Sequence, residues 1–225
     1  QKSMGIVLKR RDNADIVKHV YGGIINIIMN QRDLPRSIEF CKKECKKLLD
    51  GKITLDMLIV TKNLKGYYKN PRQIAHKVLA DRMGERDPGN KPKSNDRIPY
   101  VYIEKKVKRG EKLLQGDKIE NPQYIIENNI KPDYRIYLTN QIMKPVGQIY
   151  ALVVEQLEGY KRDSEYYNRK YKNLLEKFQD EKKTRDKIKD LRHKDACDII
   201  FADLIREATN KREGKREITD FFSQC

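Results

Sequence analysis

The sequence predicts an α+β fold that is mainly α-helical, with a few short strands, a charged helical C-terminal extension and a disordered tail. Apolar residues recur at helical spacing through most of the chain before Glu158. Three short apolar runs are typical of strands, and they cover residues 5–8, 58–60 and 98–103. From Glu158 onward charged residues dominate, so little apolar surface is left to build a further core.

The chain is expected to begin with a strand that leads into a helix. The strand lies within residues 3–10, and the helix follows over residues 14–29. Asp12 or Asn13 precedes this helix, and either side chain can accept a hydrogen bond from an N–H group of its first turn. Two adjacent glycines at 22–23 lower the helix propensity, so a kink or close packing is expected there.

A second helix is predicted over residues 34–49. Asp33 is its expected N-terminal cap, and Asp50 with Gly51 closes it. Its apolar residues share one face, and lysines cover the other. A short strand over residues 58–60 completes the first third of the chain.

A strand–helix–loop–strand unit over residues 60–103 concentrates cations. Pro71 suits the first position of a helix, so this helix is predicted over residues 71–83. Gly84 and the turn at 87–89 are expected to end it. Its buried face is expected to comprise Ile74, Ala75, Val78 and Leu79. Its cations are then left near solvent, namely Arg72, Lys77, Arg82 and Arg86.

The segments that follow this unit are predicted to be a loop or hairpin and then helices. The loop or hairpin covers residues 105–118, and a short helix covers residues 122–128. A longer helix begins at residues 132–133. Pro145 is expected to interrupt it before it resumes over residues 146–157, because proline lacks an N–H donor and clashes with the preceding turn.

The C-terminal third is predicted to be helical and then irregular. Residues 160–194 have a thin apolar stripe and charges spaced four apart, which favours a solvated helix, although contact with DNA stays open. A better amphipathic helix is predicted over residues 195–208. A polar linker is expected over residues 209–216.

The composition indicates a polyanionic partner. The 225 residues include 49 Lys and Arg against 33 Asp and Glu, which gives a net charge of +16. A charge of this size favours nucleic acid, an anionic membrane or an acidic protein. The cations are interleaved with Tyr and aliphatic residues, which favours a folded nucleic-acid-binding surface. No apolar run reaches the ~18 residues of a membrane span, so no membrane partner is expected.

The cysteines are expected to be free thiols. Cys41 and Cys45 lie four residues apart on one predicted helix and have no matching second pair, which is not the spacing of a zinc ribbon. Together with Cys197 and Cys225 they indicate an intracellular, reducing compartment.

Five collinear motifs carry a resemblance to a known family. They are MGIVLKRRD (4–12), TK (61–62), QIAHKVLADRM (73–83), RDPG (86–89) and DRIPYV (96–101). Together they resemble the C-terminal part of family B replicative DNA polymerases, and most of all the delta-like enzymes of eukaryotes and large DNA viruses. Further on, DYRIYLTNQIMKPV (133–146) resembles the thumb of the same family, so the resemblance covers roughly residues 3–157.

Two positions depart from the family pattern. Asp15 stands where the family usually has Pro, and Asn95 stands where it usually has Gly. Asn tolerates a positive φ better than most residues, so Asn95 is expected to keep the same turn. The chain also lacks the cysteine-rich metal modules of many cellular delta-like enzymes, which favours a viral type of polymerase.

The resemblance implies the end of the palm and the thumb of a DNA-directed DNA polymerase, which is a nucleotidyltransferase acting in DNA replication. Residues 1–12 correspond to the end of the palm, 13–157 to the thumb, 158–209 to a charged helical extension, and 210–225 to a linker and tail. The implied location is the nucleus or a viral replication site in the cytoplasm.

The family's catalytic aspartate motifs are not found in this sequence. No catalytic or metal-binding residue is therefore carried over, and the two Mg²⁺ ions are expected in the palm of the parent enzyme. The chain alone is expected to be inactive and to work with the rest of the polymerase chain. The alternative is a stand-alone, non-enzymatic DNA-binding or processivity adaptor.

The family thumb grips double-stranded primer–template DNA through the phosphate backbone, which is independent of sequence. The residues expected to do so here are Lys9, Arg10, Arg11, Thr61, Lys62, Arg72, Gln73, Arg82, Arg86, Lys91, Lys93 and Arg97. For each cation among them a solvated surface charge is the simpler alternative. Arg97 and Arg11 can instead pair with Asp96 and Asp12, and His76 is expected to be packed rather than in contact with DNA.

The tail resembles the peptide Q-x-x-I-x-x-F-F with which replication proteins bind a sliding clamp. Ile218, Phe221 and Phe222 match its apolar positions, and Lys215 replaces the Gln. Such a peptide inserts its apolar side chains into a pocket of the clamp, which raises the effective concentration of the polymerase at the DNA. An inert terminus is the alternative.

Overall fold

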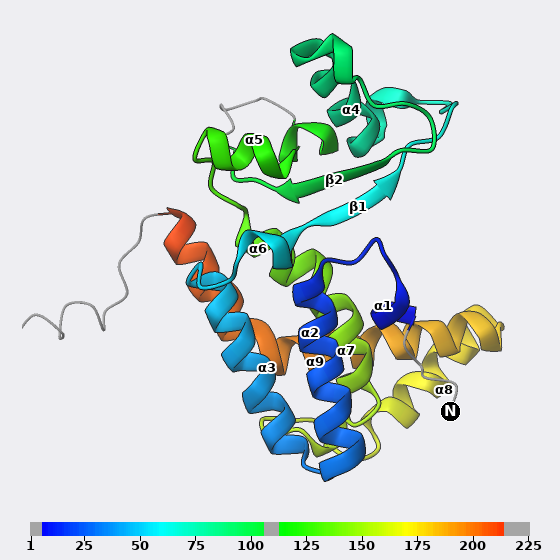
Figure 1. Ribbon diagram of the computed structural model, residues 1–225. Helices are drawn as coiled ribbons and strands as arrows, with labels where there is room; N and C mark the ends of the chain where they lie inside the picture. Colours follow the sequence, from blue (N-terminus) through cyan, green and yellow to red (C-terminus); the bar gives the residue numbers. More distant parts are fainter. Residues whose placement is uncertain (1–5, 106–112, 214–225) are drawn as a thin grey trace, which may run out of the picture. The chain divides into compact units, whose positions relative to one another are not determined.

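The computed structural model describes residues 6–105 and 113–213, and it confirms an α+β chain that is mainly helical (Figure 1). The chain divides into two compact units. The first, called the sheet unit, comprises Gln1–Gly22 and Lys47–Gln141, and the second, called the helical unit, comprises Gly23–Lys46 and Ile142–Cys225.

A three-stranded antiparallel sheet organises the sheet unit. The strands β1 (Val60–Asn63), β2 (Arg97–Tyr102) and β3 (Ile119–Glu120) follow one another in spatial order. Val60 pairs with Tyr100, and both side chains are buried. Along β2, Ile98, Tyr100 and Val101 are buried, and Arg97 at the start of the strand is exposed.

Two helices lie along β2 in the sheet unit, α4 (Ala75–Arg86) and α5 (Pro122–Glu127) (Figure 1). The short helix predicted over residues 122–128 is confirmed by α5. Its cap, Asn121, accepts hydrogen bonds from two N–H groups of the first turn. The sheet is completed by a single bridge between Ile103 and Pro132.

The predicted strand at residues 5–8 is wrong, because Ile6–Lys9 form the short helix α1. A four-residue apolar run is compatible with a strand or with a helical turn when no partner strand is known. Here the Asn13 side chain donates a hydrogen bond to the carbonyl of Val7 at 3.0 Å, which helps to hold this turn. The predicted strand at 58–60 is displaced, because Leu55–Leu58 form a 3₁₀ turn and only Val60 onward pairs with β2.

The central helix begins and ends later than predicted. Pro71–Gln73 form a separate 3₁₀ turn, and Ile74 is extended, with φ −97° and ψ 103°, before α4 starts at Ala75. The helix passes through Gly84, which is buried. A Cβ added at this position would come within 2.6 Å of the Lys91 side chain. Gly84 is therefore a packing position. Of the four predicted core residues only Leu79 is fully buried, together with Ala80 and Gly84, and the other three are half-buried.

The first two long helices run through both units. The helix α2 (Asp15–Asn26) is followed by a π-helical turn at Ile27–Gln31, which replaces the end of the predicted helix 14–29. The helix α3 (Leu34–Leu49) has the predicted bounds, and the N–H of Arg36 donates to the Asp33 carboxylate at 2.9 Å, as expected for a cap. A side chain at Gly23 would overlap the Phe40 ring, so close packing explains this glycine.

The predicted interruption at Pro145 is wrong. The segment α6 (Tyr134–Ile136) continues through a π-helical turn at Tyr137–Ile142 into α7 (Met143–Ala151), which contains Pro145. A π-helical turn changes the hydrogen-bond spacing. It therefore lets the helix pass a residue that has no N–H group to donate.

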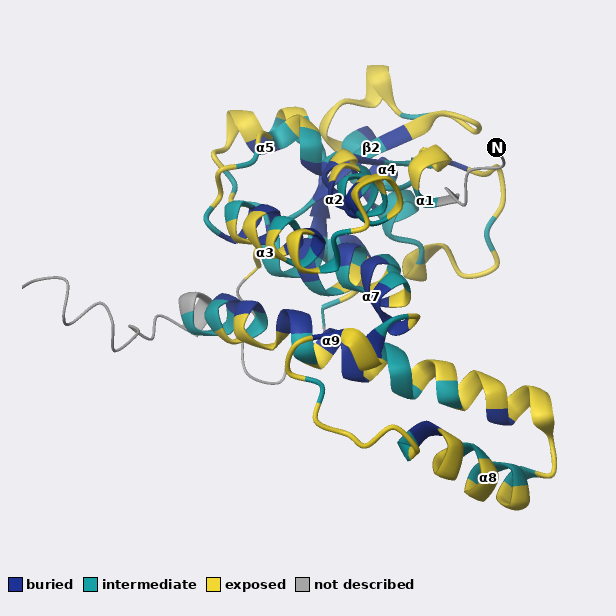
Figure 2. Cartoon of the chain, turned by 90° about the horizontal axis from the view of Figure 1, so that it is seen from below, coloured by how far each residue is buried: buried dark blue, intermediate teal, exposed yellow. Residues whose placement is uncertain are grey.

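Helices α7 and α9 form the core of the helical unit. They pack along each other, and Val146, Tyr150, Ile200 and Phe201 are buried. The Tyr150 hydroxyl donates to Ser37 Oγ at 3.2 Å, which joins this core to α3. Figure 2 shows that the buried part of α9 lies in its middle and later turns, and that its early turns are mainly exposed.

The C-terminal third forms a helical hairpin of α8 (Tyr166–Phe178) and α9 (Glu181–Glu213). The predicted helix 160–194 is broken at Gln179, whose φ of 51° is left-handed, and Asp180 then accepts a hydrogen bond from the N–H of Lys183. The helix α9 also continues past residue 209, where a polar linker was predicted. Extending a formed helix needs only propagation and no new nucleus.

Candidate nucleic-acid interface

One candidate cluster is centred on Arg97 at the start of β2. Its guanidinium donates to Thr61 Oγ1 at 2.6 Å and to Asn63 Oδ1 at 3.2 Å, so both residues lie on the same side of the ribbon as Arg97. Thr61 Oγ1 in turn donates to the carbonyl of Arg11 at 2.9 Å. The alternative pairing of Arg97 with Asp96 is not formed: Arg97 bonds Thr61 and Asn63, and Asp96 accepts the N–H of Lys93.

A second cluster is formed by Arg10, Asp12 and Lys62. Asp12 accepts two hydrogen bonds from Arg10, at 2.7 and 2.5 Å, and one from Lys62 Nζ at 2.7 Å. The hydrogen bonds from Arg10, followed by those from Lys62, hold the pKa of the Asp12 carboxyl well below its ordinary value. The expected pairing of Asp12 with Arg11 is therefore wrong, and the Arg11 side chain is exposed.

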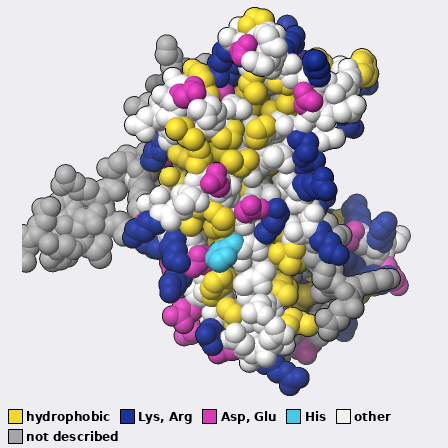
Figure 3. Space-filling view, viewed as in Figure 1, with side chains coloured by type: hydrophobic (Ala, Val, Ile, Leu, Met, Phe, Trp, Pro, Cys, Tyr) yellow, Lys and Arg dark blue, Asp and Glu magenta, His cyan; other side chains and the backbone are white. Residues whose placement is uncertain are grey.

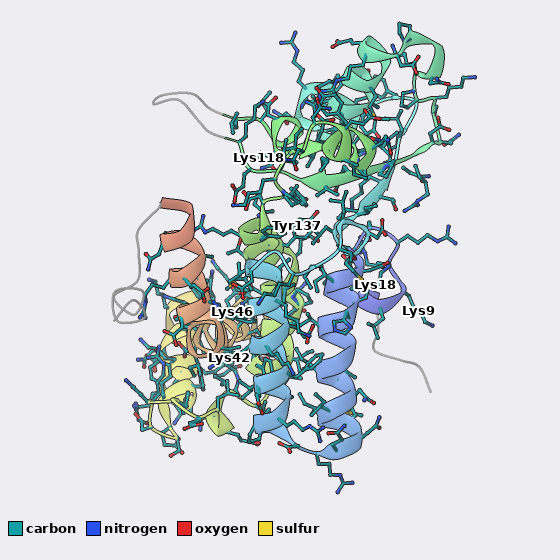
Figure 4. All side chains as sticks on the ribbon, turned by 60° about the vertical axis from the view of Figure 1, so that its left-hand side comes forward. Lys9, Lys18, Lys42, Lys46, Lys118 and Tyr137 are labelled. Atoms are coloured by element: carbon teal, nitrogen blue, oxygen red, sulfur yellow. The ribbon has the colours of Figure 1, made fainter. Side chains whose placement is uncertain are left out.

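These two clusters lie on opposite faces of the strand pair. Lys62 pairs with Ile98 in the register and Asn63 pairs with Arg97, and neighbouring residues of a strand point to opposite faces. Figure 3 shows Lys and Arg side chains gathered at the right-hand edge of the sheet unit. In Figure 4, Lys9 lies on α1 and the unpredicted Lys18 on α2, where Lys18 pairs with Asp15 at 2.7 Å.

Two loops of the sheet unit abut and carry further cations. The N–H of Leu64 donates to the carbonyl of Asp96 at 2.8 Å, and the N–H of Asn95 donates to the carbonyl of Leu64 at 2.7 Å. Asn95 has φ 74°, so it keeps the turn at which the family usually has Gly, as expected. We call residues 64–73 and 90–97 the loop surface.

The loop surface contains expected and unexpected candidates. The expected ones with exposed side chains are Arg72, Gln73, Lys91, Lys93 and Arg97. The unexpected ones are Lys65, Lys69 and Tyr67, whose side chain is 80% exposed. The sequence pattern that could have identified these three residues is an aromatic residue between two lysines, which is typical of nucleic-acid-binding surfaces. Arg72 and Gln73 lie in the 3₁₀ turn before α4, not in the first turn of α4 itself.

Arg82 and Arg86 pair with the buried Glu120, although Arg86 stays exposed, as predicted, and Arg82 is half-buried. Arg86 donates two hydrogen bonds to the Glu120 carboxylate, at 3.0 and 3.1 Å, and its guanidinium lies 3.5 Å from the centre of the Tyr124 ring. Arg82 donates to the carbonyl of Ile119 at 2.6 Å and lies 3.3 Å from Glu120. Both guanidinium groups are therefore engaged in holding α4 to β3.

Tyr137 and His76 have structural positions in the same unit. The Tyr137 hydroxyl, marked in Figure 4, donates to the carbonyl of Leu58 at 2.5 Å and accepts the N–H of Tyr102 at 3.1 Å. His76 Nε2 lies 3.0 Å from the Tyr68 hydroxyl, and its ring meets the Tyr68 ring edge to face. Burial lowers the pKa of His76, which is the behaviour of a packed histidine, as predicted.

The described residues contain no group of three or more His, Cys, Asp or Glu side chains that could hold a metal ion. Cys41, Cys45 and Cys197 are free and buried, as predicted for thiols. Burial raises the pKa of Cys197 to about 11, so it stays protonated. None of the described helices is long and apolar enough to cross a membrane. The predicted clamp-binding residues Ile218, Phe221 and Phe222 lie outside the described residues.

Comparison with known proteins extends the sequence resemblance. The chain is 51% identical over 224 residues to a DNA polymerase of Pyramimonas orientalis virus, which covers 99% of this chain and 18% of that protein. It is 53% identical over 167 residues to a DNA polymerase of Acanthamoeba polyphaga mimivirus, covering 73% of this chain and 10% of that protein. The DNA polymerase delta catalytic subunit of Candida albicans is 36% identical over 150 residues.

The chain therefore spans less than a fifth of the length of these relatives. A solved family B DNA polymerase from Pyrobaculum calidifontis matches 67% of the chain with a TM-score of 0.48 and 18% identity. The sequence model of the family described as DNA polymerase family B matches residues 1–153, which is more than half of the chain. By this match, and by the viral and delta-type relatives, the chain belongs to the family B DNA polymerases.

Proposed function

We propose that this chain is the thumb portion of a DNA-directed DNA polymerase and grips primer–template duplex during replication. The observation that carries the proposal is the loop surface, where two hydrogen-bonded loops present exposed cations in the sheet unit. Family membership supports DNA as the polyanion. A duplex moves past the thumb as it is made, so the grip must be independent of sequence, and contacts to phosphate meet that requirement.

The cations differ in how they are held. Arg97 is oriented by Thr61 and Asn63, so its remaining donors are fixed in direction before DNA binds. Lys91 and Lys93 are exposed on the loop surface. Arg10 and Lys62 share the carboxylate of Asp12, which a phosphate would have to replace as their partner. Arg82 and Arg86 contribute by fixing α4, and not by contact with phosphate.

The dependence of duplex affinity on salt tests this proposal. With about six phosphates contacted, the plot of log affinity against log salt should have a slope near −5. The variant Lys91→Gln/Lys93→Gln should make this slope less steep by about 1.8, and change affinity alike for unrelated sequences. The matched control is Lys52→Gln/Lys131→Gln, which removes two exposed lysines of the same unit and should leave the slope unchanged. A flat salt response of the wild-type chain would contradict the proposal.

We also propose that catalysis belongs to the remainder of the polymerase. Two-metal nucleotidyl transfer needs carboxylates that hold both Mg²⁺ ions at the primer end. The acidic residues near the candidate interface have other partners, since Asp12 binds Arg10 and Lys62, and Glu120 binds Arg82 and Arg86. The Mg²⁺ ions are therefore proposed to lie in the palm, outside this chain.

The third part of the proposal is that the tail binds a sliding clamp. It rests on the match of Ile218, Phe221 and Phe222 to the clamp-binding peptide. The variant Phe221→Ala/Phe222→Ala should lower affinity for the clamp of the same replication system by at least about tenfold, because two aromatic anchors are lost. Ser223→Ala is the control in the same tail. Undiminished affinity of the double variant would exclude this role.

A further inference from the structure

Helix α8 carries a basic and aromatic stripe on its solvent side. Tyr166, Arg169, Lys170 and Asn173 recur at i, i+3, i+4 and i+7, which places them along one side of the helix. With Lys172 they line an open depression of about 320 Å³ whose lining contains no acidic side chain. We call these five residues the α8 stripe.

The other side of α8 explains why the stripe faces solvent. Tyr167 is buried, and Leu174 and Phe178 are half-buried, at the spacing of one helix face. Helices α8 and α9 pack along each other, so this apolar side is covered by α9. The stripe lies on the side that α9 leaves open.

The N-terminal end of α8 is anchored to α9. Arg162 donates two hydrogen bonds to the Asp195 carboxylate, at 2.8 and 2.7 Å, and the Tyr167 hydroxyl donates to the same group at 2.8 Å. Asp195 is only 8% exposed. The Arg162 guanidinium also lies 4.1 Å from the centre of the Tyr166 ring, so the first residue of the stripe is held in place before any ligand binds.

The two helices of the hairpin differ in how their acidic side chains are paired. The acids in the early turns of α9 have partners in the same helix, as Glu181 pairs with Arg185, Asp186 with Lys189, and Asp190 with Lys187. This half of α9 fits the solvated helix predicted from the sequence. Residues 160–194 nevertheless contain thirteen Lys and Arg against seven Asp and Glu, so a surplus remains.

Helix α8 carries four Lys and Arg against one acid, Glu176. Lys170 and Lys172 line the acid-free depression, and Lys170 lies 5.9 Å from the centre of the Tyr166 ring. Arg169 pairs with Asp163 at 2.6 Å, but both side chains are more than half exposed, so a stronger anion can replace this partner. A surface with three cations, an amide donor and an aromatic ring has the groups used to bind nucleic-acid backbones.

We propose that the α8 stripe binds the phosphodiester backbone of nucleic acid, as a contact separate from the loop surface. From Tyr166 to Asn173 the helix rises about 10 Å, which is about three times the axial rise of ~3.4 Å per nucleotide of one strand. The stripe lies beyond residue 153, where the family match ends, and within the 224 residues shared with the Pyramimonas orientalis virus polymerase. The inference rests on the proposed function only in the choice of ligand.

The test compares two double variants of the full 225-residue chain. Lys170→Gln/Lys172→Gln removes charge from the stripe, and Lys187→Gln/Lys189→Gln removes the same charge from lysines paired within α9. Affinity is measured against salt for a single strand and for a duplex of equal length. The stripe variant should make the slope less steep by about 1.4 on the single strand or about 1.8 on the duplex, while the paired-lysine variant keeps the wild-type slope.

Each outcome decides between the two sites. Equal slopes for both variants, with helix content unchanged by circular dichroism, would overturn the inference. It would also be overturned if the stripe variant binds both nucleic acids normally but loses binding to vesicles that contain an anionic phospholipid. If Lys91→Gln/Lys93→Gln changes the slope and the stripe variant does not, only this inference fails. If the stripe variant alone changes the slope, the proposed role of the loop surface fails and the role of the stripe is supported.

Discussion

Glu120 shows at the scale of a single residue how a buried acid changes the role of its neighbours. Its side chain is 6% exposed and lies between Arg82 and Arg86, both on α4. The hydrogen bonds to Glu120 raise the pKa of the Arg86 guanidinium, so this group stays charged. Two arginines that the sequence marks as phosphate ligands are thereby paired with an acid of the same chain.

The substitution Glu120→Gln should lower the free energy of unfolding by about 2 kcal/mol, because two guanidinium groups lose their charged acceptor. Urea denaturation measures this change. The control Glu104→Gln removes an exposed acid that lies 3.2 Å from Lys131, and it should cost less than about 0.5 kcal/mol. If the two variants lowered the free energy of unfolding equally, the ion pairs of Glu120 would contribute no more than an exposed pair.

Asp12 should make stability depend on acid pH. Its hydrogen bonds to Arg10 and then Lys62 hold its folded-state pKa below the unfolded value of about 3.9. The folded state therefore binds fewer protons, so the stabilisation is present above that pH and is lost as the pH falls toward the folded pKa. Asp12→Asn should reduce stability at pH 7 and flatten the decline below pH ~4. Denaturation midpoints between pH 3 and 7 test this, and parallel curves for both proteins would contradict it.

At the scale of elements, the sequence predicts where the helices lie but not the irregular turns within and between them. The bounds of α3 follow from Asp33, from an apolar face and from Gly51, all of which act within a few residues. The π-helical turn before Pro145 and the left-handed Gln179 are different, because neither carries a comparable signal in the local sequence. The sequence pattern therefore placed these helices but not their irregular turns.

The two adjacent glycines of α2 should respond differently to alanine. Gly23→Ala places a methyl group into the Phe40 ring and should destabilise by about 1–3 kcal/mol. At Gly22 the nearest atom to an added Cβ is Leu8 Cδ2 at 3.3 Å, at the end of a flexible side chain. Gly22→Ala should therefore be neutral or stabilising by up to about 1 kcal/mol, through helix propensity. Thermal denaturation measures both, and equal effects would refute close packing at Gly23.

At the scale of the whole molecule, binding and chemistry are proposed to be separated. The described residues include exposed cations in the sheet unit and on α8, and Asp12, Glu120 and Asp163 are each paired with arginine or lysine. This distribution suits a part that holds nucleic acid while another part of the polymerase performs the transfer.

The purified chain should bind a primer–template duplex but not extend it. With Mg²⁺ and all four deoxynucleotides, labelled primer should keep its length, because the carboxylates that position two metal ions are expected elsewhere in the polymerase. A gel-based extension assay measures this. A competent polymerase on the same substrate is the control, and template-dependent extension by the chain itself would contradict the prediction.

The sequence by itself determined the family, the mainly helical class and the surplus of positive charge. These follow from local motifs, from periodicity and from composition, and each is fixed by residues close together in the chain. It also indicated the turn at Asn95, because a positive φ favours few residue types.

Only the tertiary structure decided which cations are free. Arg82 and Glu120 are 38 positions apart in the sequence, and Lys62 and Asp12 are 50 apart, so no local pattern predicts either contact. The fold pairs Arg82 and Arg86 with Glu120, pairs the early α9 acids within their own helix, and leaves the loop surface and the α8 stripe open to solvent. The physical reason is that ion pairing depends on distance in space, whereas the sequence shows only distance along the chain.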